Sequence, residues 1–245
     1  MRKRAASCAL ALVALVLASC GRHPPDTVLV MAASSLTDAF SEIEIAFEAA
    51  NPGLNVELNL AGSASLREQI LQGAPADVFA SANSATMQVV VDAGAAHNPV
   101  LFAGNTLQIA VPVGNPGGVT GIADLANPDL LIGLCGEQVP CGQFARQALD
   151  QAGVVASIDT NEGDVRSLVT KLEAGELDAG IVYTSDVVSS TEVEGIALPA
   201  GIDVVITYPI ADLTSANAEA ADVFVQFVVS AEGQAILAAA GFTAP

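Results

Sequence analysis

A regular alternation of strand-like and helix-like segments is the feature of this sequence that most constrains its fold. Residues 27–33 form an apolar run typical of a buried strand, and apolar side chains then recur at helical spacing from Leu36 to Phe47. Further strands are predicted at residues 54–60, 77–81, 106–113, 130–134, 179–183 and 203–212, and further helices at 63–72, 84–93, 142–152, 162–174, 218–230 and 231–240. Such alternation is typical of an α/β fold, in which helices cover open sheets and ligands bind where strands end and helices begin.

The composition excludes several classes of function. The chain has 245 residues, with 8 basic and 27 acidic side chains and a formal net charge of -19. So few Lys and Arg leave no basic surface for a phosphate backbone, and nucleic acid is therefore not expected as a partner. The hydrophobic content of 52% is too high for a disordered tail, and the length suits one large domain or two smaller ones.

The N-terminus has the pattern of an export signal. A basic start precedes an apolar stretch over residues 9–18, which is shorter than the roughly 20 residues that a helix needs to cross a bilayer. The ending Leu-Ala-Ser-Cys20 resembles the lipobox of bacterial lipoproteins, in which the Cys is acylated and becomes the mature N-terminus. We therefore predict a lipoprotein signal peptide at residues 1–19, lipidation of Cys20 and a tether over residues 20–26. A plain secretory signal with an unmodified Cys20 is the alternative.

Two further cysteines lie close together in the sequence. Cys135 and Cys141 are six positions apart, and an exported location permits a disulfide between them. A zinc site is the alternative, but it would need more ligands, and the chain offers only His23 and His97 as histidines. We expect the disulfide, which would pin a loop more than it stabilises the whole fold, because so short a ring gains little closure entropy.

The sequence offers little for catalysis. His23 lies in the predicted tether and His97 in Ala-Ala-His-Asn-Pro, a predicted loop, so no histidine is placed for a catalytic triad. A Gly-x-Ser-x-Gly elbow is absent from the sequence, and the glycine-rich residues 114–118 match no phosphate loop. We therefore predict no enzyme activity, no catalytic residue, no cofactor and no directly bound metal cation.

Hydroxyl side chains stand instead at several predicted helix starts. Ser34 and Ser35 follow the first strand and Ser63 and Ser65 follow the second, while Pro-Cys141-Gly opens a later helix. Helix N-termini have free N–H groups and partial positive charge, which suit an oxyanion. Ordinary capping is the alternative, because Ser is a favoured capping residue. The spacing of Ser35 and the acid three residues later also predicts that the first helix begins at Ser35.

An ordered set of motifs resembles the periplasmic molybdate-binding proteins. The resemblance covers residues 27–245. Its motifs are Ala33-Ser34-Ser35-Leu36-Thr37-Asp38-Ala39, Gly62-Ser63-Ala64-Ser65-Leu66, Gly73-Ala74-Pro75-Ala76-Asp77-Val78-Phe79, Val139-Pro140-Cys141-Gly142, Gly163-Asp164-Val165-Arg166, Ala179-Gly180-Ile181-Val182-Tyr183-Thr184-Ser185-Asp186 and Ala240-Gly241-Phe242. Each motif alone is modestly specific, whereas their common order is a strong signal.

The resemblance implies a two-lobed periplasmic-binding-protein fold of type II, with a mixed sheet flanked by helices in each lobe and the ligand in the cleft. The first lobe would hold residues 27–106 and 209–245, and the second would hold residues 107–208. The implied ligand contacts are the hydroxyls and amides of Ser35 and Ser63, the backbone N–H groups of Cys141 and Val165, and the hydroxyl of Tyr183. The family often has a small residue such as Ala where Cys141 stands, a change that keeps the backbone donor. Arg146 and Arg166 are expected to pair with nearby acids.

The function that the resemblance implies is capture of molybdate or tungstate outside the cytoplasm and delivery to the membrane permease of an ABC importer. The protein would be a monomer, lipid-anchored to the cell membrane and facing the periplasm or the cell exterior. A donor-lined cavity suits a fully deprotonated tetrahedral dianion, which only accepts hydrogen bonds. Sulfate has the same charge and shape, so a sulfate-binding protein is the nearer alternative. An exported enzyme on a similar two-lobed fold is the more distant one.

Overall fold

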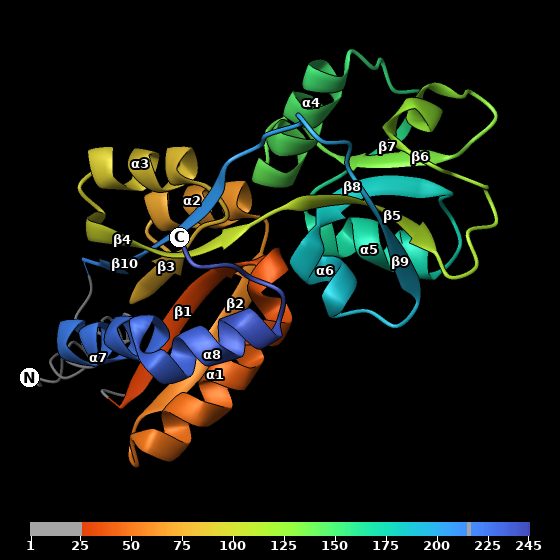
Figure 1. Cartoon of the computed structure of the whole chain (residues 1–245). Coiled ribbons are helices and arrows are strands. Elements are labelled where there is room, and N and C mark those ends of the chain that lie inside the picture. The colour runs from red at the N-terminus through yellow and green to blue at the C-terminus, as the bar shows by residue number, and fades with distance from the viewer. Residues whose placement is uncertain (1–25, 215–216) are drawn as a thin grey trace, which may run out of the picture.

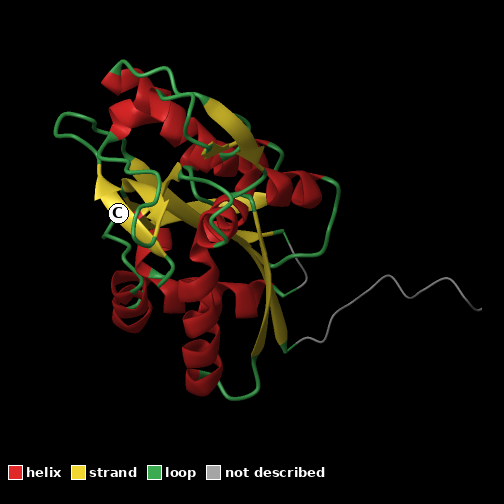
Figure 2. Ribbon diagram, turned by 90° about the vertical axis from the view of Figure 1, so that its right-hand side faces the viewer, coloured by secondary structure: helices red, strands yellow, loops and turns green. Residues whose placement is uncertain are grey.

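The computed structural model describes residues 26–214 and 217–245, and the predicted signal peptide and Cys20 lie outside them. The described chain forms two separate five-stranded sheets, each with helices on its faces (Figures 1 and 2). The predicted α/β class, with two mixed sheets flanked by helices, is therefore confirmed.

The first sheet contains the N-terminal strands and one strand from near the C-terminus. Its strand order is β2-β1-β3-β10-β4, with β1 parallel to β2 and β3, and β10 antiparallel to both of its neighbours. Helices α1, α7 and α8 lie on one face and α2 and α3 on the other (Figure 1). The bounds are β1 Thr27–Ala33, β2 Asn55–Ala61, β3 Val78–Ala80, β4 Ala96–Asn105, β10 Ile206–Leu213, α1 Thr37–Ala50, α2 Ser63–Leu71, α3 Ser84–Asp92, α7 Ala218–Val229 and α8 Ala231–Ala239.

The second sheet is built from the middle of the chain. Its order is β7-β6-β8-β5-β9, with β6 parallel to β7 and β8, and β5 antiparallel to β8 and β9. Helix α4 packs against β6 and β8, and α5 and α6 also pack on this sheet. The bounds are β5 Leu107–Pro112, β6 Ile132–Cys135, β7 Ile158–Glu162, β8 Ala179–Tyr183, β9 Val193–Ala197, α4 Pro140–Ala152, α5 Val165–Glu173, α6 Thr184–Val188, and the 3₁₀ turns η1 Ser34–Leu36 and η2 Ile122–Ala126.

The chain passes between the two sheets at two neighbouring places. Strand β4 ends at Asn105 and β5 begins at Leu107, so only one residue separates the sheets there. The chain returns after β9, and β10 begins at Ile206, which pairs with Asn105. Both crossings therefore lie side by side, as Figure 1 shows between the two sheets.

Two predictions about local structure were wrong. The first helix does not begin at Ser35: residues 34–36 form the turn η1, no side chain caps α1, and α1 itself begins at Thr37. His97 does not lie in a loop, because it is part of β4 and pairs with Asp212. The sequence did not indicate this strand, because Asn98 is followed by a proline, a pair that is typical of loops; in the structure Asn98 has a positive φ of 45°. An edge strand such as β4 tolerates both interruptions.

The core of the first sheet is aromatic on the face that α1 and α7 cover. Phe40 and Phe47 of α1 contact Phe224 of α7 edge to face, with ring centroids 6.1 and 5.2 Å apart.

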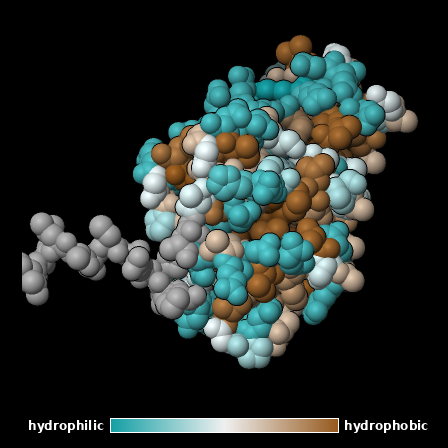
Figure 3. Space-filling view, turned by 90° about the vertical axis from the view of Figure 1, so that its left-hand side faces the viewer, coloured by the Kyte–Doolittle hydropathy of each residue, from teal (hydrophilic) through white to brown (hydrophobic). Residues whose placement is uncertain are grey.

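Among the described residues no single helix is long and apolar enough to span a membrane, although α7 and α8, bent by 59°, pass that test of length and composition as a pair. Figure 3 shows the face over α3, β4 and α7, where apolar and polar side chains alternate in small patches.

Candidate functional site

All five residues predicted to contact ligand line one narrow cleft between the two sheets. Ser35 comes from η1, directly after β1, and Ser63 is the first residue of α2. From the other sheet come Cys141 near the start of α4, Val165 at the start of α5 and Tyr183 at the end of β8. The complete lining is Ala33, Ser34, Ser35, Gly62, Ser63, Ala82, Val139, Pro140, Cys141, Asp164, Val165 and Tyr183. Segments more than a hundred residues apart, from two different sheets, therefore converge on one cleft.

The two serines on the first side of the cleft are buried and already hydrogen-bonded. Ser63 Oγ accepts a hydrogen bond of 3.0 Å from the backbone N–H of Ala82. Ser35 Oγ lies 3.0 Å from the hydroxyl of Tyr208, a residue 173 positions away. A hydroxyl that accepts one hydrogen bond still has its own proton to give. Ser63 can therefore donate into the cleft.

The other side of the cleft offers backbone N–H groups and one phenol. Cys141 and Val165 lie in the first turns of α4 and α5, where N–H groups have no carbonyl partner within the helix. The Tyr183 side chain is 1% exposed, and its hydroxyl makes no hydrogen bond with any described residue. Together with Ser63, these groups place several hydrogen-bond donors around a cleft whose lining is otherwise mostly apolar.

A disulfide and a glycine shape the start of α4. Cys135, at the end of β6, is joined to Cys141 with their Cα atoms 5.7 Å apart. Gly142 has no room for a side chain, because a Cβ there would overlap the carbonyl oxygens of Cys135 and Gly136. Arg146 donates to the Cys135 carbonyl oxygen at 2.8 Å. No group of three or more possible metal-ligating side chains occurs among the described residues, so the zinc alternative has no support there.

Acidic side chains near the cleft cap a helix, pair with an arginine or hold a proton. Asp164 caps α5 by accepting a hydrogen bond of 2.9 Å from the Ser167 N–H, and Asp38 pairs with Arg166 at 2.9 Å. Asp186 is 4% exposed, and its burial raises its pKa to about 8. Asp186 is therefore mostly protonated at neutral pH, and it adds little negative charge near the site.

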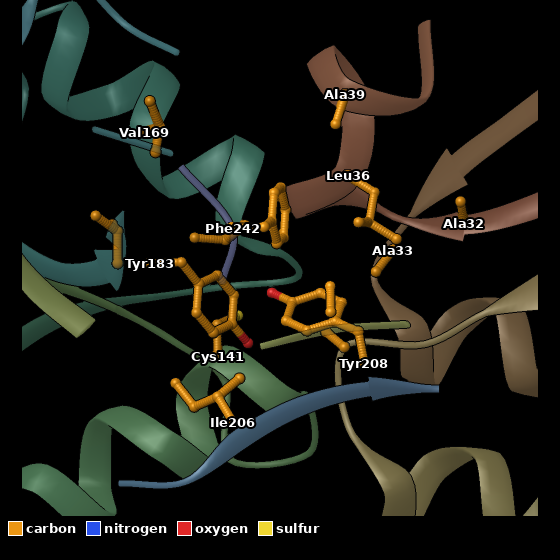
Figure 4. Close-up of a cluster of buried hydrophobic side chains, with 14 of the residues drawn as sticks. Ala32, Ala33, Leu36, Ala39, Cys141, Val169, Tyr183, Ile206, Tyr208 and Phe242 are labelled. Atoms are coloured by element: carbon orange, nitrogen blue, oxygen red, sulfur yellow. The ribbon is translucent and has the colours of Figure 1, made fainter. Parts of the chain in front are cut away.

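The two tyrosines beside the cleft keep their protons over a wide pH range. Burial, and then the neighbouring Tyr208, raise the pKa of Tyr183 well above 10. Burial likewise raises the pKa of Tyr208, although its hydrogen bond with Ser35 opposes that shift. The two rings lie next to each other, with centroids 6.0 Å apart (Figure 4).

Comparison with known proteins identifies the family. Residues 28–243 match the family model described as bacterial extracellular solute-binding protein. The chain belongs to this family. The chain is also 39% identical over 249 residues to the molybdate-binding protein ModA of Mycobacterium tuberculosis, with 96% of this chain and 95% of that protein covered. The resemblance inferred from the motifs is confirmed, and membership in an extracellular family agrees with the predicted export.

Two solved structures share the fold of this solute-binding protein. The periplasmic molybdate-binding protein of Azotobacter vinelandii superimposes with a TM-score of 0.78 at 21% identity, over 89% of this chain and 99% of that one. The sulfate-binding protein SubI of Mycobacterium tuberculosis gives 0.77 at 20% identity, over 88% and 86%. The two scores are almost equal, so the fold alone does not choose between the two anions.

Direct contacts join the two sides of the cleft in this solute-binding protein. Besides the Arg166–Asp38 ion pair, the Asn83 amide donates to Gln143 Oε1 at 3.0 Å. The backbones also approach closely, since a Cβ on Gly62 would lie 2.8 Å from the carbonyl oxygen of Gly163. The described conformation therefore has the cleft closed around its donor groups.

Sequence reasoning missed two residues that the structure places beside the site. Tyr208 was predicted only to lie in the strand over residues 203–212, yet its hydroxyl lies 3.0 Å from Ser35 Oγ. Asp186 belonged to a recognised motif, but nothing in the sequence indicated that its carboxyl group is buried and accepts a hydrogen bond of 3.0 Å from the Tyr183 N–H. Ser65 was singled out with Ser63, but its side chain is exposed on α2.

Proposed function

We propose that this protein captures molybdate, and also tungstate, outside the cytoplasm and delivers it to the membrane permease of an ABC importer. The observation that carries the proposal is the convergence of Ser35, Ser63, Cys141, Val165 and Tyr183 on one cleft. The 39% identity to a molybdate-binding protein over nearly the whole chain favours molybdate over other anions.

The chemistry of the cleft supports a fully deprotonated dianion as ligand. Molybdate has four oxygen atoms that accept hydrogen bonds and no proton to give, so it matches a surface of hydroxyl and N–H donors. Hydrogen phosphate would turn its own O–H group towards donors, and a poorly made hydrogen bond costs about 1 to 3 kcal/mol. Sulfate would have to be rejected by size, because the larger molybdate fills a cavity in which sulfate makes long, weak bonds.

We propose that the two sheets are the cores of two lobes that close on the ligand. The predicted boundaries, with residues 27–106 and 209–245 in one lobe and 107–208 in the other, are supported by the division of the strands between the sheets. One boundary needs adjustment, since β10 begins at Ile206 and already pairs with the first sheet there. Ligand that touches both lobes favours the closed form, and we infer that this form is recognised by the permease.

The membrane association proposed for the protein rests on its N-terminus. We propose that Cys20 is acylated, that the lipid anchors a monomer to the cell membrane, and that the mature protein carries no enzyme activity. The sequence of the lipobox supports the anchor, since two or more acyl chains hold a protein firmly where one chain binds only weakly. Metabolic labelling with a clickable fatty acid should label the wild type and leave Cys20→Ala unlabelled. An unlabelled wild type would contradict the anchor.

Isothermal titration calorimetry with molybdate, tungstate, sulfate and phosphate tests the proposed ligand. Molybdate and tungstate should bind more tightly than sulfate, and phosphate should bind most weakly. Ser35→Ala and Ser63→Ala should each weaken molybdate binding by roughly 10- to 100-fold, as expected for the loss of a hydrogen bond to a charged group. Ser65→Ala is the matched control on the same helix and should bind like the wild type. Tighter binding of sulfate than of molybdate would contradict the proposal and favour a sulfate-binding protein.

A further inference from the structure

Tyr208 stands directly behind the ligand-facing serine Ser35. Its side chain is fully buried, and it comes from β10, where the chain crosses between the sheets. The Tyr208 hydroxyl is 3.0 Å from Ser35 Oγ. Ser35 lines the cleft and Tyr208 does not, so Tyr208 acts on a ligand through a neighbouring side chain, and Ser35 is the one within hydrogen-bond distance of its hydroxyl.

The direction of this hydrogen bond decides what Ser35 offers to a ligand. A hydroxyl has one proton and can accept through its lone pairs. If Tyr208 donates to Ser35, a lone pair of Ser35 is occupied and the Ser35 proton is free to point into the cleft. If Ser35 donates to Tyr208 instead, Ser35 has only lone pairs left for the ligand. The first arrangement suits an anion without protons, and the second suits an anion that carries an O–H group.

The surroundings of Tyr208 hold its hydroxyl in place. The ring packs edge to face between Phe102, Tyr183 and Phe242, with centroid distances of 6.2, 6.0 and 5.4 Å. Figure 4 shows Phe242 and Tyr183 beside the Tyr208 ring, on the side opposite Ala32 and Ala33. A ring fixed in this way keeps its hydroxyl oxygen beside Ser35, because moving that oxygen would require the core to repack.

The second serine of the cleft has a comparable partner. Ser63 Oγ receives its hydrogen bond from the backbone N–H of Ala82, a group that can only donate. The Ser63 proton is consequently left for the ligand. Each serine thus has a buried partner able to fill its acceptor site, although the two partners come from different parts of the chain.

We propose that Tyr208 is a positioning residue that donates to Ser35, makes Ser35 a hydrogen-bond donor to the ligand, and so selects fully deprotonated oxyanions against protonated ones such as hydrogen phosphate. This inference rests on the proposed function and adds a residue to its specificity. Specificity of this kind arises from a poor fit for the wrong ligand as much as from a good fit for the right one.

The test is the affinity ratio for two anions in the full-length protein and in Tyr208→Phe, which removes only the hydroxyl. Molybdate binding is measured by calorimetry and hydrogen phosphate binding by displacement of molybdate, at slightly alkaline pH. In Tyr208→Phe, the preference for molybdate over hydrogen phosphate should fall by about tenfold, the scale of one hydrogen bond. Phe242→Leu disturbs the same ring cluster but leaves the hydroxyl, so it should lower the melting temperature and keep the ratio within twofold.

A double-mutant cycle asks whether Tyr208 acts through Ser35. In a Ser35→Ala background, Tyr208→Phe should change the ratio by less than twofold, because the group that it positions is gone. An unchanged ratio in Tyr208→Phe, or a shift that persists in the Ser35→Ala background, would overturn the inference. If the wild type prefers sulfate, the proposed ligand is wrong, but the ratio of sulfate to hydrogen phosphate tests Tyr208 in the same way. A wild type that binds none of these anions overturns both.

Discussion

Replacing the buried Asp186 by Asn should stabilise the protein at neutral pH. Burial raises the pKa of Asp186 from 3.8 to about 8, Asp38 and Asp164 add to the rise, and the Tyr183 N–H and Arg166 oppose it. The folded protein therefore holds a proton that the unfolded chain releases at neutral pH. Under this linkage, the contribution of Asp186 to the free energy of unfolding is most favourable below about pH 4. It falls as the pH rises towards 8 and levels off above that pH.

The size of the effect follows from the pKa difference of Asp186. One pKa unit corresponds to about 1.4 kcal/mol, so the loss of stability grows by about that amount per pH unit and reaches roughly 4 kcal/mol at pH 7. An Asn side chain does not titrate, and its carbonyl oxygen can still accept the hydrogen bond that Tyr183 N–H donates at 3.0 Å. The advantage of Asp186→Asn over the wild type should therefore be small near pH 4 and increase steadily towards pH 7.

Urea unfolding at a series of pH values measures this difference directly. The free energies of unfolding of wild type and Asp186→Asn should diverge with a slope of about one proton, roughly 1.4 kcal/mol per pH unit. Asp222→Asn, at an exposed position of α7, is the control and should run parallel to the wild type. If the curves of wild type and Asp186→Asn also run parallel, Asp186 is ionised in the folded protein and the reasoning is refuted.

Three further predictions concern the start of α4 and the closed cleft. Gly142→Ala should lower the free energy of unfolding in urea by about 1 to 3 kcal/mol, because the added Cβ would overlap backbone oxygens. In the control Gly136→Ala the added Cβ makes only an ordinary contact, so this variant should unfold like the wild type. Equal losses of unfolding free energy in the two variants would contradict the prediction. Arg166→Ala removes a half-exposed ion pair across the cleft, so the molybdate affinity measured by calorimetry should fall by less than about fivefold. The loss should be smaller still in high salt. A loss larger than about fivefold would indicate that Arg166 contacts the ligand directly. Thiol titration of the denatured, non-reduced Cys20→Ala protein, with residues 1–19 removed, should find neither Cys135 nor Cys141 free, and two free thiols would exclude the disulfide.

The parts of the site that depend on local sequence could be predicted. Ser63 stands at the first residue of a helix and Tyr183 at the end of a strand, and both positions follow from short motifs and the alternation of elements. Strand-to-helix junctions bring such residues to one edge of each sheet, and the predicted set lies together because these edges of the two sheets meet at the cleft. The disulfide between Cys135 and Cys141 likewise depends on a spacing of only six residues.

The parts that depend on distant contacts could not be predicted. Tyr208 meets Ser35 across 173 positions, and no local pattern indicates such a pair. Strand β7 reads Ile-Asp-Thr-Asn-Glu, with none of its side chains fully buried, so it lacks the apolar signal of an inner strand. Asn98 in β4 has a positive φ, a conformation that is typical of Asn in turns and not of a strand. Each of these features is fixed by tertiary neighbours.

The central claim is that molybdate is held between the two sheets by the residues that line the cleft. The most direct measurement is a crystal structure of the protein grown with molybdate, with an anomalous difference map recorded at the molybdenum absorption edge. We expect one strong peak, from the molybdenum atom, in the cleft. The molybdate oxygens around it should lie within hydrogen-bonding distance of the hydroxyls of Ser35, Ser63 and Tyr183 and of the backbone N–H groups of Cys141 and Val165. A map whose only strong peak lies outside this cleft, or an empty cleft at saturating molybdate, would contradict the account.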